Sequence, residues 1–435
     1  MAKGTPAKVT VSTPVGSAAV PSPVTLPAAT DLALPCPYRQ SALLQQALSP
    51  DKMRVGFFLG AGCPTSIHVT RSGNNEPLIP NIMGLTDKIR TRMNGSVEHK
   101  AHFASILTQL GDSGTNRRTI EHVLTRIRGL LEVVGSVGFD GMSESDLSRL
   151  DNAICAAIDG VMRERLPTRN TPYHHLAAWI GSIPRAHPVE VFTSNYDLLM
   201  EQAFEECAVP YFDGFSGSDR TFFDVPSMEQ LSLPPQWARL WKVHGSINWW
   251  RTADGKIQRR ERGGPDASQM IHPSHLKYEE SRKMPYLAMQ DRLRSFLARG
   301  QAVLVTCGYS FLDDHINQAI LDGLSGNPTA VCFGLVFGDR QSAASAIEKA
   351  GPRGNLRLLG VDGGVLGTID RDWHAKPKRD DQMHGLAVCT GSLRDRTTAP
   401  DDRCKFLLGN FKSLGEFLAD QLARRGQAEG DDDAT

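Results

Sequence analysis

The sequence lacks the cysteine spacing of a metal site or a disulfide framework. Its eight cysteines are scattered along 435 residues, and no C-x-x-C pair occurs. Isolated cysteines of this kind are typical of a reducing compartment. We therefore expect a cytoplasmic protein that binds no metal ion.

Net charge and long apolar runs are absent as well. Lys+Arg and Asp+Glu both total 48, so no net field draws the chain toward nucleic acid or an anionic membrane. No apolar run approaches the roughly 20 residues of a transmembrane helix. Residues 1–35 are apolar enough to imitate a signal peptide, but prolines interrupt the stretch repeatedly. We interpret it as a flexible arm and expect neither membrane insertion nor direct nucleic-acid binding.

Strands and helices alternate along the rest of the chain. Short apolar strands are expected from Val55 onward, at 189–193, near 302–307 and near 330–335, each with a helical pattern further along. The helical signal is strongest at 119–134, where apolar residues recur at helical spacing. Such alternation favours an α/β fold: a Rossmann-like parallel sheet with helices on both faces and a helical insertion.

These patterns also predict how the chain is divided. The expected parts are a flexible arm at 1–35, a catalytic domain at 36–370 with a helical insertion at about 80–185, an irregular linker at 371–402, an amphipathic helix at 403–425 and an acidic tail at 426–435. The C-terminal helix carries an apolar stripe from Leu407 to Leu422 that must be buried. Packing on its own domain and contact with another subunit are both open.

Small and polar residues gather in four segments of the type that follows a strand, at 60–66, 193–197, 244–246 and 308–313. In a parallel sheet, ligands bind beyond the carboxyl ends of the strands, at a crossover point. Taken singly, the residues have structural explanations. Asn195 and Asp197 are suited to capping a helix, His244 to a hydrogen-bonded position beside aromatic residues, and Ser310 to another helix cap.

Their joint order resembles a known family. The motifs G-A-G, T-x-N-x-D, H-G and G-x-S stand at 60–62, 193–197, 244–245 and 308–310. In this order and spacing they resemble the sirtuin catalytic domain, specifically the sirtuin-like branch of bacterial antiphage defence proteins. The resemblance covers roughly residues 50–370.

The resemblance implies that the glycine turn binds NAD. The implied cofactor-binding residues are Gly60, Ala61, Gly62, Thr65, Ser66, Thr193, Gly308, Tyr309 and Ser310. One departure stands at Pro64, where family members usually carry a serine. A proline here is suited to the first turn of the following helix.

The implied catalytic residues are Asn195, His244 and Asp197. Nicotinamide on ribose is already a cationic leaving group, so positive charge develops on the ribose as the bond breaks. Asn195 would hold a ribose hydroxyl or water, His244 would take a proton near neutral pH, and Asp197 would favour the cationic ring.

Deacylases of this family carry a four-cysteine zinc module near the peptide groove, and no such quartet occurs here. Water is then the expected nucleophile, and hydrolysis of NAD+ to ADP-ribose and nicotinamide the expected reaction. An NAD-dependent protein deacylase and a non-catalytic nucleotide-binding scaffold remain alternatives. The resemblance further implies antiphage defence by NAD+ depletion, in a homo-oligomer with a HerA-type ATPase as its candidate partner.

Overall fold

A computed structural model describes most of the chain between residues 37 and 432. The described ranges are 37–49, 53–114, 117–134, 138–168, 170–182, 185–230, 233–261, 268–271, 284–373 and 405–432. The arm expected at 1–35 and most of the linker expected at 371–402 lie outside them. Within these ranges, no helix combines the length and apolarity that crossing a bilayer requires.

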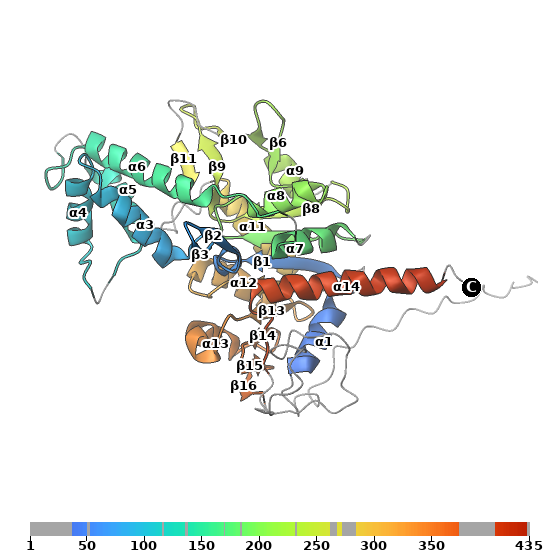
Figure 1. Ribbon diagram of the computed structural model, residues 1–435. Helices are drawn as coiled ribbons and strands as arrows, with labels where there is room; N and C mark the ends of the chain where they lie inside the picture. Colours follow the sequence, from blue (N-terminus) through green and yellow to red (C-terminus); the bar gives the residue numbers. More distant parts are fainter. Residues whose placement is uncertain are drawn as a thin grey trace, which may run out of the picture. The chain divides into compact units, whose positions relative to one another are not determined.

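A nine-stranded sheet forms the centre of the fold (Figure 1). Its strands, in spatial order, are β16 (Ile369–Asp372), β15 (Gly363–Leu366), β14 (Leu356–Leu359), β13 (Val331–Leu335), β12 (Ala302–Cys307), β1 (Arg54–Leu59), β4 (Glu190–Thr193), β8 (Ala238–Lys242) and β5 (Tyr211–Phe212). Every pairing from β14 to β5 is parallel, whereas β15 and β16 are added antiparallel at one edge. Because β4, β8 and β12 are covered on both faces, they are buried throughout and mostly apolar, rather than alternating between buried and exposed residues.

The order of the strands places a crossover beside β1. The chain passes from β1 to β4, β5 and β8 on one side, then crosses to β12, β13 and β14 on the other. In the paired register, Gly56 of β1 lies opposite Leu304 and Glu190. The carboxyl ends of β12, β1 and β4 therefore meet at one edge, where an open α/β sheet binds its ligands.

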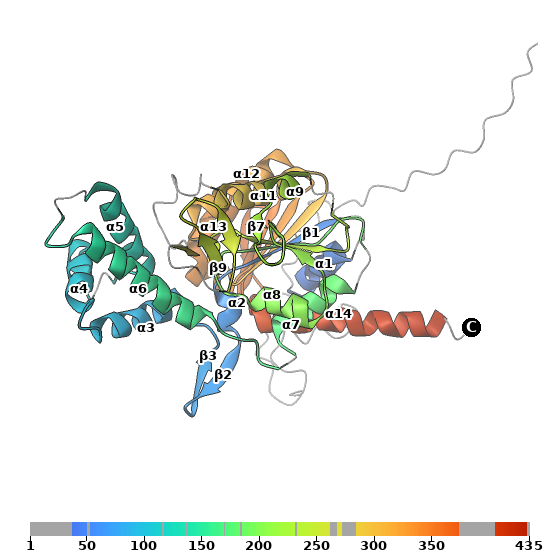
Figure 2. The same cartoon turned by 90° about the horizontal axis from the view of Figure 1, so that it is seen from above.

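Helices cover both faces of this sheet (Figure 2). One face carries α11 (Tyr286–Ala298), α12 (Asp314–Gly326) and α13 (Ala344–Ala350), and the other carries α1 (Pro37–Leu48), α7 (Pro172–Gly181), α8 (Leu199–Glu206) and α14 (Phe411–Asp432). Neighbouring residues of β1 show the two faces, because Gly56 approaches Phe296 of α11 whereas Phe57 contacts Trp179 of α7. The expected fold class is confirmed.

A separate group of helices follows β1 in sequence. It consists of α3 (Ile82–Asn94), α4 (Lys100–Gln109), α5 (Ile120–Val133) and α6 (Glu144–Met162), which contact one another. The apolar stripe of α5 is buried as predicted, except that Leu130 takes the core position expected for Leu131. The insertion was expected to reach about residue 185, but α7 packs on the sheet, so the separate group ends with α6.

Several short strands escaped the sequence patterns. The stretch after the glycine turn forms a hairpin of β2 (His68–Arg71) and β3 (Asn74–Pro77). Its turn is tight because Ser72 and Gly73 both have positive φ. The remaining short elements are α2 (Gly62–Thr65), β6 (Phe215–Ser216), β7 (Phe222–Phe223), α9 (Val225–Gln230), β9 (Gly245–Arg251), β10 (Ile257–Arg259), β11 (Ser268–Ile271) and a 3-10 helix at Arg340–Ala343.

The C-terminal helix packs on its own chain. Phe411 meets the ring of Tyr173 in α7 at 4.9 Å, and Leu414 and Leu418 are fully buried. Of the two possibilities for the apolar stripe, packing on its own domain is therefore the one observed. The helix begins at Phe411 rather than near 403, and the preceding Gly409 lies against the backbone of Val336, which follows β13.

Candidate active site

The carboxyl ends of β1 and β12 are joined through their backbones. Gly60 N donates to Cys307 O at 2.9 Å, and Gly62 N donates to Gly308 O at 2.9 Å. Two of the four predicted segments are thereby brought together. Ala61 and Gly62 remain exposed at the surface of this turn, whereas Cys63 behind them is buried.

Each glycine of this turn lies so close to the backbone of the other strand end that a side chain would not fit. A Cβ on Gly60 would lie 2.2 Å from Gly308 O, and one on Gly308 would lie 2.6 Å from Cys63 N. Gly308 also has a φ of +64°, which L side chains rarely adopt. Close approach of a ligand is one reason for glycine at this turn. The structure gives a second reason, because the ends of β1 and β12 lie too close together for side chains.

The third segment, after β4, is attached to the glycine turn by side chains. Thr193 Oγ1 donates to Leu59 O at 2.8 Å and accepts from Asn195 N at 3.0 Å. Asn195 Nδ2 then donates to Gly60 O at 3.1 Å. Asn195 therefore does not cap a helix: its amide binds the turn that precedes α2.

The fourth segment, between β8 and β9, completes the arrangement. Val243 N donates to Thr193 O at 2.9 Å, which fixes His244 beside the end of β4. His244 Nε2 lies 3.1 Å from Asp313 Oδ2, close enough for an ion pair but not aligned as a hydrogen bond. Since Asp313 follows β12, each of the four segments now contacts its neighbours.

Asp313 is a site residue that sequence reasoning did not single out. Its Oδ1 accepts from His315 N and Ile316 N and so caps α12, a role expected for Ser310. The other oxygen, Oδ2, is the one that faces His244. A polar side chain between a buried strand and a helix was its only signal in the sequence, and the same signal marks ordinary helix caps.

Asp197 lies among buried groups beneath its loop. Its Oδ1 accepts from Leu199 N at 3.0 Å, but the N-cap residue of α8 is Leu198 rather than Asp197. Its Oδ2 has no hydrogen-bond partner in the described part of the chain. Burial raises the pKa of Asp197 to about 6, although the Lys242 cation opposes this. Asp197 is close enough to act electrostatically on Cys63 and Tyr173.

Most hydroxyl groups of the predicted cofactor-binding residues form hydrogen bonds within the protein. Thr65 Oγ1 donates to Ala61 O at 3.0 Å, and Ser66 Oγ donates to Cys63 O at 2.7 Å. Tyr309 is buried and its hydroxyl donates to Asn317 Oδ1 at 2.8 Å, so the ring belongs to the core. Ser310, by contrast, is exposed. Pro64 lies in the first turn of α2, where its missing N–H costs nothing.

Cys63, buried behind the glycine turn, offers little for chemistry. Burial, followed by a hydrogen bond with Cys307, raises the pKa of Cys63 well above its usual value, so its thiol is not a nucleophile at neutral pH. In the described ranges, no three His, Cys, Asp or Glu residues gather as a metal site would need. A cavity of about 740 Å³ lies beside α7 and α8, but none of its lining residues belongs to the four segments.

Part of the chain is similar to a known family model. Residues 189–350 match the family model of the SIR2-like domain. This span runs from β4 to α13 and holds three of the four segments, whereas the Gly60 turn precedes it. No curated protein matches the chain.

Solved structures of Sir2 proteins are also similar to the chain. A crystal structure of a Sir2 homolog–NAD complex has a TM-score of 0.36 at 12% identity, covering 70% of this chain and 86% of that one. A structure described under the mechanism and regulation of Sir2 enzymes has a TM-score of 0.33 at 12% identity, covering 68% and 84%. A Sir2 homologue–ADP-ribose complex has a TM-score of 0.31 at 11% identity, with the same coverage.

Proposed function

We propose that this chain is an NAD+ glycohydrolase that cleaves NAD+ to ADP-ribose and nicotinamide. The observation that carries the proposal is the closed set of contacts among four strand ends, which holds Asn195 and His244 at the same sheet edge as the glycine turn. The SIR2-like match over 189–350 supports it, because that span contains both residues.

The exposed glycine turn supplies the binding surface in this proposal. Ala61 and Gly62 present backbone at the surface, with Ser310 exposed on the adjoining loop. With no large side chain on the turn, a pyrophosphate can approach the main chain directly. The ribose that bears nicotinamide would then lie toward Asn195 and His244.

The proposed chemistry follows from the atoms left facing a ligand. Asn195 Nδ2 is bound to Gly60 O, which leaves Oδ1 as the acceptor for a ribose hydroxyl or an attacking water. As water attacks the ribose carbon and the bond to nicotinamide breaks, His244 takes the proton that water loses. The Asp313 carboxylate, 3.1 Å away, attracts the imidazolium so formed.

The test is nicotinamide release by purified protein and by Asn195→Ala and His244→Ala. We expect each substitution to lower the rate by about 100-fold or more. Asn195 is buried and bonded, so its loss should also lower the free energy of unfolding by about 1 kcal/mol. Asn94→Ala and His187→Ala, at exposed positions, are the matched controls and should retain the wild-type rate.

Near-normal release from either site variant would refute the assignment. Cleavage that occurs only with an acylated peptide present would instead support the deacylase alternative. Tight NAD+ binding with no cleavage under any condition would support the scaffold.

The biological setting is proposed on family resemblance alone. We propose antiphage defence through NAD+ depletion, with homo-oligomerisation and a HerA-type ATPase as partner. Since the apolar stripe of α14 is buried on α7, assembly would use another surface. Mass photometry of the chain, alone and with the ATPase, combined with the NAD+ assay, tests this part.

A further inference from the structure

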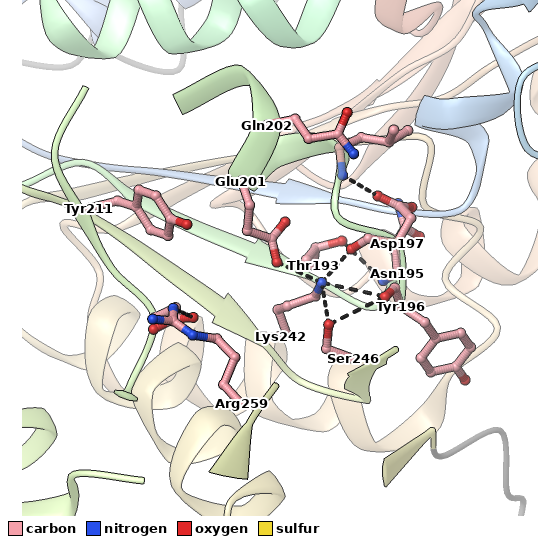
Figure 3. Close-up of polar contacts among 12 residues, drawn as sticks. Thr193, Asn195, Tyr196, Asp197, Glu201, Gln202, Tyr211, Lys242, Ser246 and Arg259 are labelled. Carbon is pink, nitrogen blue, oxygen red and sulfur yellow. Dashed lines mark hydrogen bonds and ion pairs between the residues drawn. The ribbon is translucent and has the colours of Figure 1, made fainter. Parts of the chain in front are cut away.

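A buried lysine lies between the two loops that carry Asn195 and His244. Lys242 is the last residue of β8, and its side chain is 1% exposed. Figure 3 shows its ammonium group among Tyr196, Asp197, Glu201 and Ser246. A lysine is almost never fully buried unless its charge is paired, so the groups around Lys242 must compensate for its burial.

The ammonium group contacts acceptors from three separate elements. Lys242 Nζ donates to Glu201 Oε1 of α8 at 2.8 Å and to Ser246 Oγ of β9 at 2.8 Å. It also donates to Asp197 O, and Tyr196 O lies at 3.5 Å. These two carbonyls belong to the turn that directly follows Asn195.

Only one of these contacts neutralises charge. Glu201 supplies the carboxylate that makes burial of the cation tolerable. The other contacts orient backbone and side chain, and they lie on both sides of the site: the Asn195 turn on one side, and Ser246, two residues after His244, on the other. Ile247 N also donates to Tyr196 O at 3.0 Å, so the two loops are bonded to each other at the same place.

We propose that Lys242 is a positioning residue that holds the Asn195 turn and the His244 loop in one fixed relation. It acts through these loops and does not itself contact the reacting atoms. The effect on rate rests on the proposed NAD+ cleavage, whereas the effect on the order of the loops does not.

Two variants separate positioning from simple loss of an ion pair. Glu201→Gln is the control for loss of the ion pair alone, because it removes the carboxylate but keeps the ammonium group and a hydrogen-bond acceptor for it. Lys242→Met combined with Glu201→Gln removes the ammonium group together with the carboxylate that pairs with it. Loss of the Lys242 cation also raises the pKa of the buried Asp197 further. The two proteins are compared by hydrogen exchange at the amides of Asn195, Leu199 and Ile247, by kcat and KM for NAD+, and by the Kd for ADP-ribose.

We expect exchange at these amides to be about tenfold faster in the double variant than in the control, with exchange in β12 unchanged. We also expect kcat to fall by about 100-fold, while KM and the ADP-ribose Kd stay within about threefold. Unchanged exchange at the three amides, or exchange that rises equally in β12, would overturn the proposal. So would a loss that lies mainly in the Kd.

Two further outcomes are also decisive. If wild-type protein fails to cleave NAD+, the proposed function fails, and the exchange comparison alone decides the role of Lys242. If the double variant does not fold, Ser246→Ala takes its place, since it removes the link to the His244 loop and keeps both charges. Faster exchange at Ile247 in Ser246→Ala is then the expected result, and unchanged exchange overturns the proposal.

Discussion

The candidate site has two halves that are held together in different ways. The glycine half comprises the ends of β1 and β12, with Gly60, Gly62 and Gly308, and its contacts are backbone hydrogen bonds. The polar half comprises residues 193–197 and 242–246, and its contacts come mainly from side chains. The first half needs side chains to be absent, whereas the second needs particular side chains to be present. Substitutions should therefore damage the halves in different ways.

The glycine half should be most sensitive to added bulk, which gives the largest expected effect. In Gly60→Val, the new Cβ would lie 2.2 Å from Gly308 O, and backbone cannot move aside as a flexible side chain can. We expect the free energy of unfolding to fall by about 3 kcal/mol or more, measured by urea denaturation.

The matched control is Gly354→Ala. A Cβ at Gly354 meets nothing within 4 Å, so stability should change by no more than about 0.5 kcal/mol. If Gly60→Val were as stable as wild type, the two strand ends would not be in the close contact that defines this half.

The same contrast explains how much the sequence could predict. The glycine half could be predicted from the sequence because only glycine fits such close backbone contact. This requirement appears in the sequence as a short glycine motif. In the polar half, the sequence singled out Asn195 and His244 but not Lys242. Asp313, which faces His244 from the loop after β12, was not singled out either. Lys242 is paired with Glu201, which lies 41 residues earlier in the chain. A contact over that distance leaves no local pattern in the sequence.

The fold shows the same limit. Apolar strands that alternate along the chain with helical stripes predicted the parallel sheet, because parallel strands that are buried on both faces are mostly apolar. The antiparallel strands β15 and β16 and the β2–β3 hairpin were not predicted. These elements are short, and β2, β3 and β16 are largely exposed, so they lack the apolar run that marks a strand.

The polar half should respond to pH, which tests whether its side chains are buried as described. Burial raises the pKa of Asp197 to about 6, above the value near 4 expected in the unfolded chain. Between these values Asp197 binds more protons in the folded state than in the unfolded state, so its contribution to stability falls as pH rises from about 4 to about 6. In Asp197→Asn this contribution is absent, and the stability difference between the two proteins should change by about 2 to 3 kcal/mol over that window.

Urea denaturation at several pH values measures this difference. Asp219→Asn serves as the control, because the Asp219 side chain is 96% exposed and its curve should run parallel to that of wild type. If Asp197→Asn also ran parallel to wild type, Asp197 would not be a buried, ionisable member of the polar half.

The smallest expected effect concerns the hydroxyl that joins the two halves. Thr193 Oγ1 donates to Leu59 O at the end of β1 and accepts from Asn195 N. Thr193→Val keeps the shape of the side chain but leaves both backbone groups without this partner, at a cost of about 2 kcal/mol in the free energy of unfolding. Thr70→Val, at an exposed strand position, should change stability by no more than about 0.5 kcal/mol.

Because Asn195 loses its anchor to Thr193, NAD+ cleavage should also fall in Thr193→Val. A stability loss with full cleavage would mean that the glycine half alone is sufficient to place Asn195.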